Sequence, residues 1–522
     1  MNDSQGRSNS ENNKRILKNT LALYFRQIIT MFVALFTSRI VLQTLGVTDF
    51  GINNVVGGVV AMLSFLTSSL AGTTQRFLSV ELGKNDHAKL KQVFANSLSL
   101  HVIFILLTIA LAETVGLWFL QNKLVIPPER AEAAFWVYQF SVASFAISVF
   151  FAPFEGAIRA HEKFSFYAKM SIFDVIMKLA IAYSLVILPY DKLVALSFLG
   201  VCVVFIGRMI MYAYCRIHFE ECRIRLSWAK DNIRQLLGYN FYRIIREISA
   251  VIRHQGINII LNLYYGPVMN AAQGIATQVR NSVSSFIYNA IIAAEPQIVM
   301  SFAQNDRPRL WTLITRTSRL YFYLFLILAL PFILEIDTAL YIWLGYYPKY
   351  TAVFVRLFLL EALIGTLASI ISTVDLAVGK LRTTTIIHVS IRLSILTIAI
   401  FVGLNNLSPI YIYASVLFFE IVFIISFLLI VIKKHLDFSL RKYLIDIILP
   451  ISKTSIIVAS LPIVLHYFFS TSMRSSCIVG FFTLIWSAII IFYVGLDRRE
   501  KQMIIDKLPP FLRGILWVPN NE

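Results

Sequence analysis

Charged side chains recur within one long apolar stretch of the sequence, at spacings of three, four and seven residues. They are Arg243, Arg246, Glu247, Arg253 and His254. At about 100° per residue, these positions fall on one side of a helix. Guanidinium groups stay charged at any relevant pH and can bind two phosphate oxygens at once. This polar helix face is therefore expected to bind an anion, and a diphosphate would suit it well.

Two further apolar stretches carry polar groups of the same kind. Gln273, Arg280 and Asn281 lie in the next predicted helix, with Arg280 near its middle, and Arg26 lies in the first predicted helix. The candidate substrate-binding residues are therefore Arg26, Arg246, Arg253, Arg280, Gln273 and Asn281. An alternative stays open, in which these arginines form ion pairs inside one half of the protein or extend to the membrane surface.

Acidic residues also lie deep within later apolar stretches. Glu361 and Glu420 occur there together with Arg356 and Arg392. Charges at membrane depth are costly, and they usually pair with one another or face water. Either this set pairs between helices, or Glu361 or Glu420 is a carboxylate that binds a proton or a coupling ion.

The helices that position these groups must lie in lipid, because the chain is too apolar for an aqueous fold. Of its 522 residues, 57% are hydrophobic and 15% are charged, and the mean hydropathy is +0.71. Soluble domains carry about 25% charged residues. Apolar runs of roughly 20 residues, continuous rather than alternating, predict about fourteen membrane-spanning helices and exclude a β-barrel. We therefore expect an all-α polytopic membrane protein.

An internal repeat relates the two halves of the chain. A single gapless offset places Arg26 on Arg246, Gly46 on Gly266 and Glu155 on Asp375. Six predicted helices separate the copies, and this even number predicts two six-helix lobes related by a pseudo-two-fold axis along the membrane normal. The expected parts are a polar cytoplasmic tail (1–14), an N-lobe (15–216), a cytoplasmic linker (217–235), a C-lobe (236–435), two extra helices (443–497) and a basic cytoplasmic tail (498–522).

The net charge of +18 is distributed unevenly along the chain. Lysines and arginines concentrate in those segments between spans that lie on the same side as both termini, and the positive-inside rule places this side in the cytoplasm. This distribution explains the basic charge without nucleic acid as a partner. No P-loop, HExxH or paired-cysteine pattern occurs, so we expect no catalytic residue, no metal and no cofactor.

Three patches of the sequence resemble lipid-linked oligosaccharide flippases of the O-antigen (Wzx) type. They are RIVLQTLGVTDFGINNVV at residues 39–56, EGAIRAHEK at residues 155–163 and NAAQGIA at residues 270–276. These flippases belong to the MOP (multidrug/oligosaccharidyl-lipid/polysaccharide) exporter superfamily, which also contains multidrug exporters and the lipid II flippase. The resemblance extends over about residues 15–435.

The resemblance implies a function in the bacterial inner membrane. Such a protein moves an undecaprenyl-diphosphate-linked oligosaccharide from the inner to the outer leaflet by alternating access through a cationic central cavity. The implied partners are this lipid-linked glycan, membrane lipid, and polysaccharide polymerase or assembly proteins. On this interpretation Arg26, Arg246, Arg253 and Arg280 contact the diphosphate or the sugars.

Three alternatives remain open from the sequence. A cation-coupled multidrug exporter generally needs a carboxylate in its first lobe, but no acidic residue occurs between Leu17 and Gln43. A lipid II flippase would share the arginines, but the second predicted helix has Asn53 and Asn54 and no core arginine. A membrane scaffold or a glycan polymerase is the third alternative, and a polymerase would be expected to carry a larger outer loop.

Overall fold

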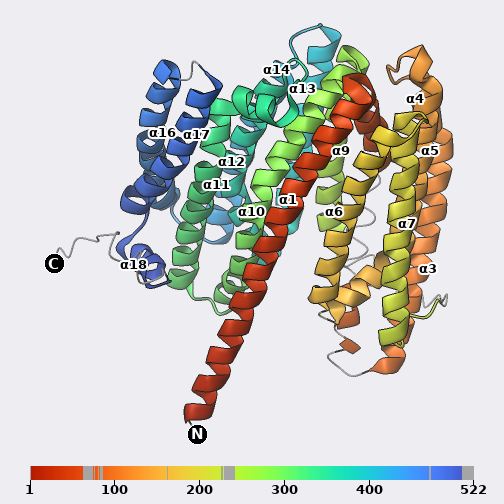
Figure 1. Ribbon diagram of the computed structural model, residues 1–522. Helices are drawn as coiled ribbons and strands as arrows, with labels where there is room; N and C mark the ends of the chain where they lie inside the picture. The colour runs from red at the N-terminus through yellow and green to blue at the C-terminus, as the bar shows by residue number, and fades with distance from the viewer. Residues whose placement is uncertain are drawn as a thin grey trace. The chain divides into compact units, whose positions relative to one another are not determined.

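The computed structural model describes most of the chain. The described residues are 2–62, 74–75, 77–79, 81–82, 86–161, 163–224, 227, 241–469 and 472–507, and within them the side chains of residues 2–28 and 288–297, among others, are not described. All regular structure in these ranges is helical (Figure 1). The predicted all-α class is therefore confirmed.

Eleven helical segments of the described part are long and apolar enough to cross a membrane. The chain is thus a multi-pass membrane protein. The predicted number of fourteen stays a prediction, for two reasons. Helix α1 (Asn2–Ala61) contributes one such segment although it contains a break. Helices α9 (Phe241–Tyr265) and α10 (Pro267–Ala303), which carry the polar residues of interest, are not among the eleven.

Glycines break the chain at two positions that the repeat places on one another. Gly46 interrupts α1 with φ of 79°, and Gly266 separates α9 from α10 with φ of 77°. Glycine adopts this left-handed conformation without the steric cost of a Cβ atom. The repeat therefore extends to backbone conformation, which is what a duplicated pair of helices requires.

The chain divides into two compact units. The first comprises residues 1–278, 343–354 and 385–415. The second comprises residues 279–342, 355–384 and 416–522.

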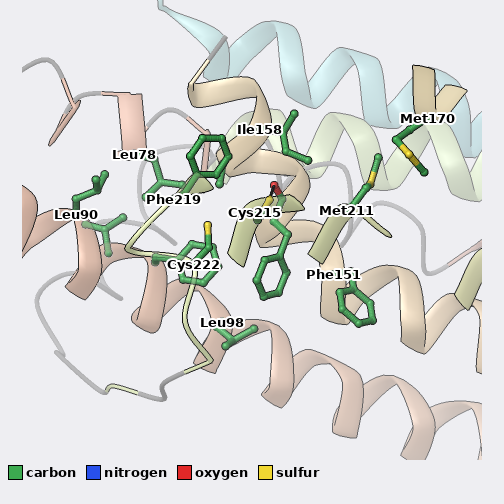
Figure 2. Packing of buried hydrophobic residues seen from close by; sticks show 14 residues of the cluster. Leu78, Leu90, Leu98, Phe151, Ile158, Met170, Met211, Cys215, Phe219 and Cys222 are labelled. Atoms are coloured by element: carbon green, nitrogen blue, oxygen red, sulfur yellow. Dashed lines mark hydrogen bonds between the residues drawn. The ribbon is translucent and has the colours of Figure 1, made fainter. Parts of the chain in front are cut away.

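In the first unit, helices pack around a core of large apolar side chains. Helix α5 (Ala131–Ala160) packs against α3 (His87–Leu111) and α7 (Lys192–His218), and α6 (Phe164–Ile187) packs against α7 and α1 (Figure 1). Figure 2 shows one core cluster, in which Leu98, Phe151 and Ile158 surround Cys215 and Cys222. Both cysteines are free thiols that fill space in this core.

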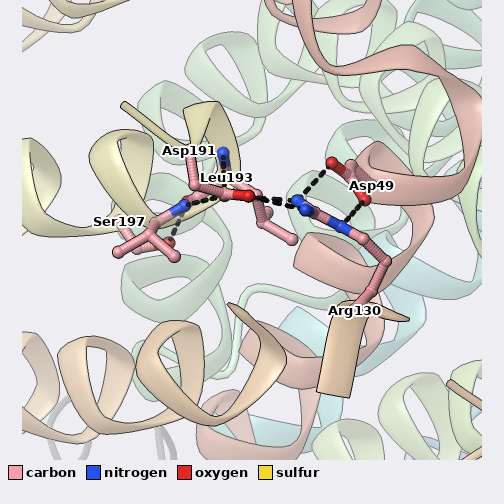
Figure 3. Close-up of polar contacts among 6 residues, drawn as sticks. Asp49, Arg130, Asp191, Leu193 and Ser197 are labelled. Carbon is pink, nitrogen blue, oxygen red and sulfur yellow. Dashed lines mark hydrogen bonds and ion pairs between the residues drawn. The ribbon is translucent and has the colours of Figure 1, made fainter. Parts of the chain in front are cut away.

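Arg130, Asp49 and Asp191 form an ion triad that connects three segments of the first unit (Figure 3). Arg130 donates to both carboxylate oxygens of Asp49 on α1, at 2.8 and 2.6 Å, and to Asp191 at 2.6 and 3.2 Å. Asp191 also caps α7 by accepting from the backbone N–H groups of Leu193 and Val194 at 3.1 Å. Burial alone would raise the pKa of Asp191, but the bonds from Arg130 and from the capped helix hold it below its usual value.

In the second unit, α11 (Arg307–Leu344) runs beside helices from later in the chain. It contains Pro331 and departs from helical geometry at Glu335, whose carboxylate lies 2.6 Å from His466 of α16 (Leu449–Phe469). Helix α16 pairs with α17 (Met473–Ile490), as Figure 1 shows. Arg356 of α12 (Thr351–Val378) binds the Ile333 carbonyl near this departure at 3.0 Å.

Candidate functional site

Two polar helix faces meet in the first unit, one on α9 and one on α13 (Leu381–Leu404). Arg246 of α9 donates from Nε to Thr385 Oγ1 at 2.9 Å. Arg392 of α13 donates from Nη1 to the Arg246 carbonyl oxygen at 3.0 Å and to Ser249 Oγ at 3.2 Å. Each helix therefore holds an arginine of the other in place through a neutral oxygen.

A histidine and a further arginine complete this group. His388 interacts electrostatically with Arg392, Arg246 and Arg253. We call Arg246, Arg253, His388 and Arg392 the arginine cluster. Arg246 is only 9% exposed, whereas its sequence neighbour Glu247 is exposed, so Glu247 lies at the outer edge of the predicted polar face and does not share the buried surroundings of Arg246. Charges in such partly dry surroundings act more strongly on an anion than they would in water.

A cavity lined by amide groups begins one residue beyond Arg253 on α9. We call it the amide cavity, and its volume is about 280 Å³. Helices α1, α9 and α10 supply its wall. The lining residues are Asn53, Asn54, Gly57, Gly58, Ala61, His254, Gln255, Asn258, Gln273, Gly274 and Thr277.

Buried asparagines fix the positions of the three helices around the amide cavity. Asn270 donates to the carbonyl and side-chain oxygens of Asn258, at 2.6 and 2.7 Å. Asn258 donates to the Asn54 carbonyl at 3.2 Å, and Asn262 donates to Asn270 Oδ1 at 3.2 Å. Buried amides that bond to one another in this way hold a polar wall in a defined arrangement.

Glycines let the same three helices approach closely. A Cβ atom at Gly274 would lie within 3 Å of the Asn54 side chain, and one at Gly58 would lie 2.7 Å from Gln255 Oε1. Neither position can take a larger residue unless its neighbour moves. Gly57 is different, because nothing lies within 4 Å of the place where its Cβ would be. A side chain at this position would therefore point into the open space of the cavity.

A second cavity adjoins the same stripe of α1, formed by Asn53, Gly57 and Ala61, and extends toward α5 and α7. We call it the serine cavity, and its volume is about 390 Å³. It is lined by Asn53, Gly57, Val60, Ala61, Phe140, Ser141, Ser144, Phe145, Ser148, Leu196 and Ser197. Its polar groups are one amide and four hydroxyl groups, and they are set among aromatic and aliphatic side chains.

In the second unit, Arg280 lies close to one of the predicted carboxylates. Its Nη2 atom is 3.7 Å from Glu361 Oε2, and Glu361 is 6% exposed. Glu361 therefore lies beside Arg280, which was predicted as a substrate contact, whereas Arg356 of the expected set forms an ion pair with Asp337 at 2.7 Å. Glu420, the other predicted carboxylate, lies near Gly365, where an added Cβ would be 3.5 Å from its Oε1 atom.

The structure does not bring all of the predicted residues together. Arg246 and Arg253 belong to the arginine cluster, and Gln273 lines the amide cavity. Asn281 is exposed, and the side chain of Arg26 lies outside the described residues. Among the residues that the structure describes, no three His, Cys, Asp or Glu side chains form a group able to hold a metal ion.

Several residues of the site are not among the predicted substrate contacts, although the spacing on their own helices indicates a polar face. Thr385, His388 and Arg392 recur at steps of three and four, which is the spacing of Arg246, Ser249 and Arg253 on α9. This pattern on residues 384–404 was a detectable sign of a second polar face. The spacing of Ser141, Ser144 and Ser148 along α5 is a similar sign.

Comparison with known proteins places this geometry in a known fold. No family model matches the sequence, and no curated protein matches it either. Among solved structures, an inward-facing MATE-family multidrug resistance transporter superposes with a TM-score of 0.66 at 13% identity, covering 79% of this chain and 98% of that one. The lipid II flippase MurJ, in an inward closed conformation, superposes with a TM-score of 0.64 at 13% identity, covering 90% of this chain and 98% of that one.

A third similar structure is a MOP superfamily transporter from Pyrococcus furiosus, described as having a binding pocket of reverse polarity. Its TM-score is 0.57 at 14% identity, and the match covers 78% of this chain and 94% of that one. At these identities the likeness concerns the fold. This multi-pass membrane protein therefore has the fold of the MOP superfamily of transporters.

Proposed function

We propose that the protein is a flippase that moves an undecaprenyl-diphosphate-linked oligosaccharide from the inner to the outer leaflet of the bacterial inner membrane by alternating access. The cargo is the repeat unit of an O-antigen, a capsule or an exopolysaccharide. One observation carries the proposal: the arginine cluster and the amide cavity share α9, with Arg253 followed directly by His254 and Gln255.

The arginine cluster supports a diphosphate as the charged part of the cargo. Arg246, Arg253 and Arg392 gather on two adjoining helix faces, and Thr385 and Ser249 orient two of them. Guanidinium groups bind phosphate oxygens through two N–H donors at once. Charged side chains are costly to bury in a membrane, so a cluster of arginines there is expected to line a substrate pathway.

The same cluster argues against a cationic drug as cargo. A cation brought near Arg246, Arg253 and Arg392 would be repelled, and the repulsion is strong where little water screens it. A multidrug exporter is therefore the weaker alternative. Arg280, Asn281 and Arg26 stay proposed contacts of the diphosphate or the sugars, and Glu361 or Glu420 stays the proposed carboxylate for ion coupling.

A lipid II flippase is the second candidate, favoured by the comparison with MurJ. That match covers 90% of this chain, whereas the match with the MATE transporter covers 79%. Both candidates carry a lipid-linked cargo, whose lipid part would stay in contact with membrane lipid in either case. We further propose that both termini are cytoplasmic, from the distribution of lysine and arginine, and that polymerase or assembly proteins receive the product.

The test is the lipid content of cells depleted of this protein. The proposal predicts that undecaprenyl-diphosphate carrying an oligosaccharide accumulates in the inner leaflet and that surface polysaccharide is lost. Accumulation of lipid II with cell lysis would instead identify the peptidoglycan precursor as the cargo. Sensitivity to cationic dyes without any lipid accumulation would contradict the proposal.

A further inference from the structure

We propose that the amide and serine cavities form one compartment for the sugars of the cargo, and that it accepts neutral sugars and discriminates against carboxylated ones. This inference rests on the proposed function and assigns the chemistry of the glycan. It concerns a different part of the site from the arginine cluster, which holds the charge.

The two cavities meet along one stripe of α1, and we infer that a single ligand lies across it and occupies both. Asn53, Gly57 and Ala61 of α1 line each of them. Their volumes are about 280 and 390 Å³. Together they fall within the range of about 300–1,000 Å³ that is typical of small-molecule sites. A short oligosaccharide lying across Gly57 would therefore contact α9 and α10 on one side and α5 and α7 on the other.

The lining is polar but uncharged. Among the lining residues that the structure describes, none is Asp, Glu, Lys or Arg, and His254 is the single ionisable side chain. The remaining polar groups are amides and hydroxyls. Such groups suit sugar hydroxyl and acetamido groups, which both donate and accept hydrogen bonds.

Three buried oxygen atoms of residues that line the amide cavity lack a hydrogen-bond partner among the described residues. They are Gln273 Oε1, Gln255 Oε1 and Thr277 Oγ1, and Gln273 is only 3% exposed. A buried acceptor without a donor is costly, so these atoms favour a ligand that supplies donors. Sugar hydroxyls would supply them once these side chains turn toward the cavity. A carboxylate offers acceptors alone and would meet these oxygens without a cation from the described lining to offset its charge.

The serine cavity adds a surface for the less polar faces of sugar rings. Phe140 and Phe145 lie beside Ser141 and Ser144 in its lining. Aromatic rings bury large apolar areas, and the adjacent hydroxyls can meet the polar edge of the same ring. Ser141 donates its own proton to the Val137 carbonyl at 2.7 Å, so its oxygen remains available as an acceptor.

The test uses the purified full-length protein in lipid vesicles. The cargoes are three fluorescent polyprenyl diphosphates that carry one neutral sugar, a neutral trisaccharide, or the same trisaccharide with one sugar replaced by a uronic acid. We expect the neutral trisaccharide to move on the order of tenfold faster than the acidic one, or more, which is the discrimination expected when a buried acceptor faces a charge without a donor. Equal rates for the two trisaccharides would overturn the inference.

A blocking variant tests the location of the compartment. Gly57→Leu places a side chain in the shared wall, where nothing lies within 4 Å of the added Cβ, so the helix packing should tolerate it. Gly200→Leu is the matched control, because Gly200 of α7 also has open space around it and lines neither cavity. We expect Gly57→Leu to slow the neutral trisaccharide about tenfold more than the single sugar, with both unchanged in the control. Wild-type rates for the trisaccharide in Gly57→Leu would overturn the assignment.

An exchange of specificity separates this inference from the proposed function. Asn53→Lys adds a cation where the two cavities meet, and we expect it to speed the acidic trisaccharide relative to the neutral one. An unchanged preference in folded Asn53→Lys would contradict the inference. If the wild-type protein moved none of the three lipids, the proposed function itself would fail. If it moved all three alike, only the neutral-glycan assignment would fail.

Discussion

Replacement of Arg246 by lysine separates the shape of the guanidinium group from its charge. In the structure Nε of Arg246 binds Thr385 at 2.9 Å, and this bond fixes the plane of the group. Lysine keeps the positive charge but loses both this bond and the paired N–H donors that fit a phosphate. Hydrogen bonds to charged groups contribute about 1.5–3 kcal/mol each. One such bond lost from the transported state corresponds to a decrease of roughly 10- to 100-fold in rate.

The assay is the initial rate at which a lipid-diphosphate glycan crosses vesicles that contain equal amounts of each variant. Thr385→Val serves as a companion, because it removes only the oxygen that orients Arg246. It should cost less, about 0.5–1.5 kcal/mol, or roughly 3- to 10-fold in rate. Arg216→Lys is the matched control, since Arg216 is exposed on α7, where it donates to the Tyr212 hydroxyl at 3.2 Å. A wild-type rate in Arg246→Lys would refute the reasoning and leave Arg246 with a simple charge or structural role.

Three further predictions concern stability. Arg280→Gln should lower the free energy of unfolding by about 1–3 kcal/mol, because Glu361 loses a cation 3.7 Å away. The double variant Arg280→Gln with Glu361→Gln should recover part of that loss when unfolding in detergent is measured. Additive effects of the two substitutions would contradict a coupling between these side chains. Arg130→Gln should lower the free energy of unfolding by about 2 kcal/mol, because Asp49 and Asp191 lose their shared cation. The loss is moderate because both carboxylates are partly exposed. The folded pKa of Asp191 is lowered, so its contribution to stability is complete above the unfolded value of about 4 and is lost as the pH falls through the folded value. The melting temperature should therefore drop more steeply in acid for the wild type than for Arg130→Gln, in which only the helix cap still lowers this pKa; parallel pH profiles would contradict this. Gly51→Ala should destabilise by about 1–3 kcal/mol, because its Cβ would overlap the Pro267 carbonyl oxygen, and an unchanged melting temperature would show that the helices can separate.

The features of the fold that depend on local sequence were predictable. Long apolar runs indicated membrane-spanning helices, and eleven segments of the described chain qualify. The offset that aligned Gly46 with Gly266 indicated two equivalent breaks, and both glycines have positive φ. These features follow from composition and from backbone sterics at one residue, so no knowledge of tertiary contacts is needed.

The site was only partly predictable, because it depends on which helix faces meet. The face of α9 with Arg246 and Arg253 was evident from its spacing. That Arg392 would reach the Arg246 carbonyl was not, since periodicity describes one helix and not its partner. The amide cavity was missed for a related reason. It requires Asn53 on α1 and Gln273 on α10 to face the same space, and neither residue signals the other in the sequence.

The most direct test of the central claim is reconstitution of the purified protein in vesicles with a fluorescent polyprenyl-diphosphate trisaccharide, whose leaflet is read with a membrane-impermeant quencher. We predict that the protein moves the lipid between leaflets much faster than in protein-free vesicles. We also predict that Arg253→Gln, which removes one charge of the arginine cluster, abolishes most of this activity while the protein stays folded. Failure of the wild-type protein to move this lipid, with transport of a cationic dye in the same vesicles, would contradict the claim.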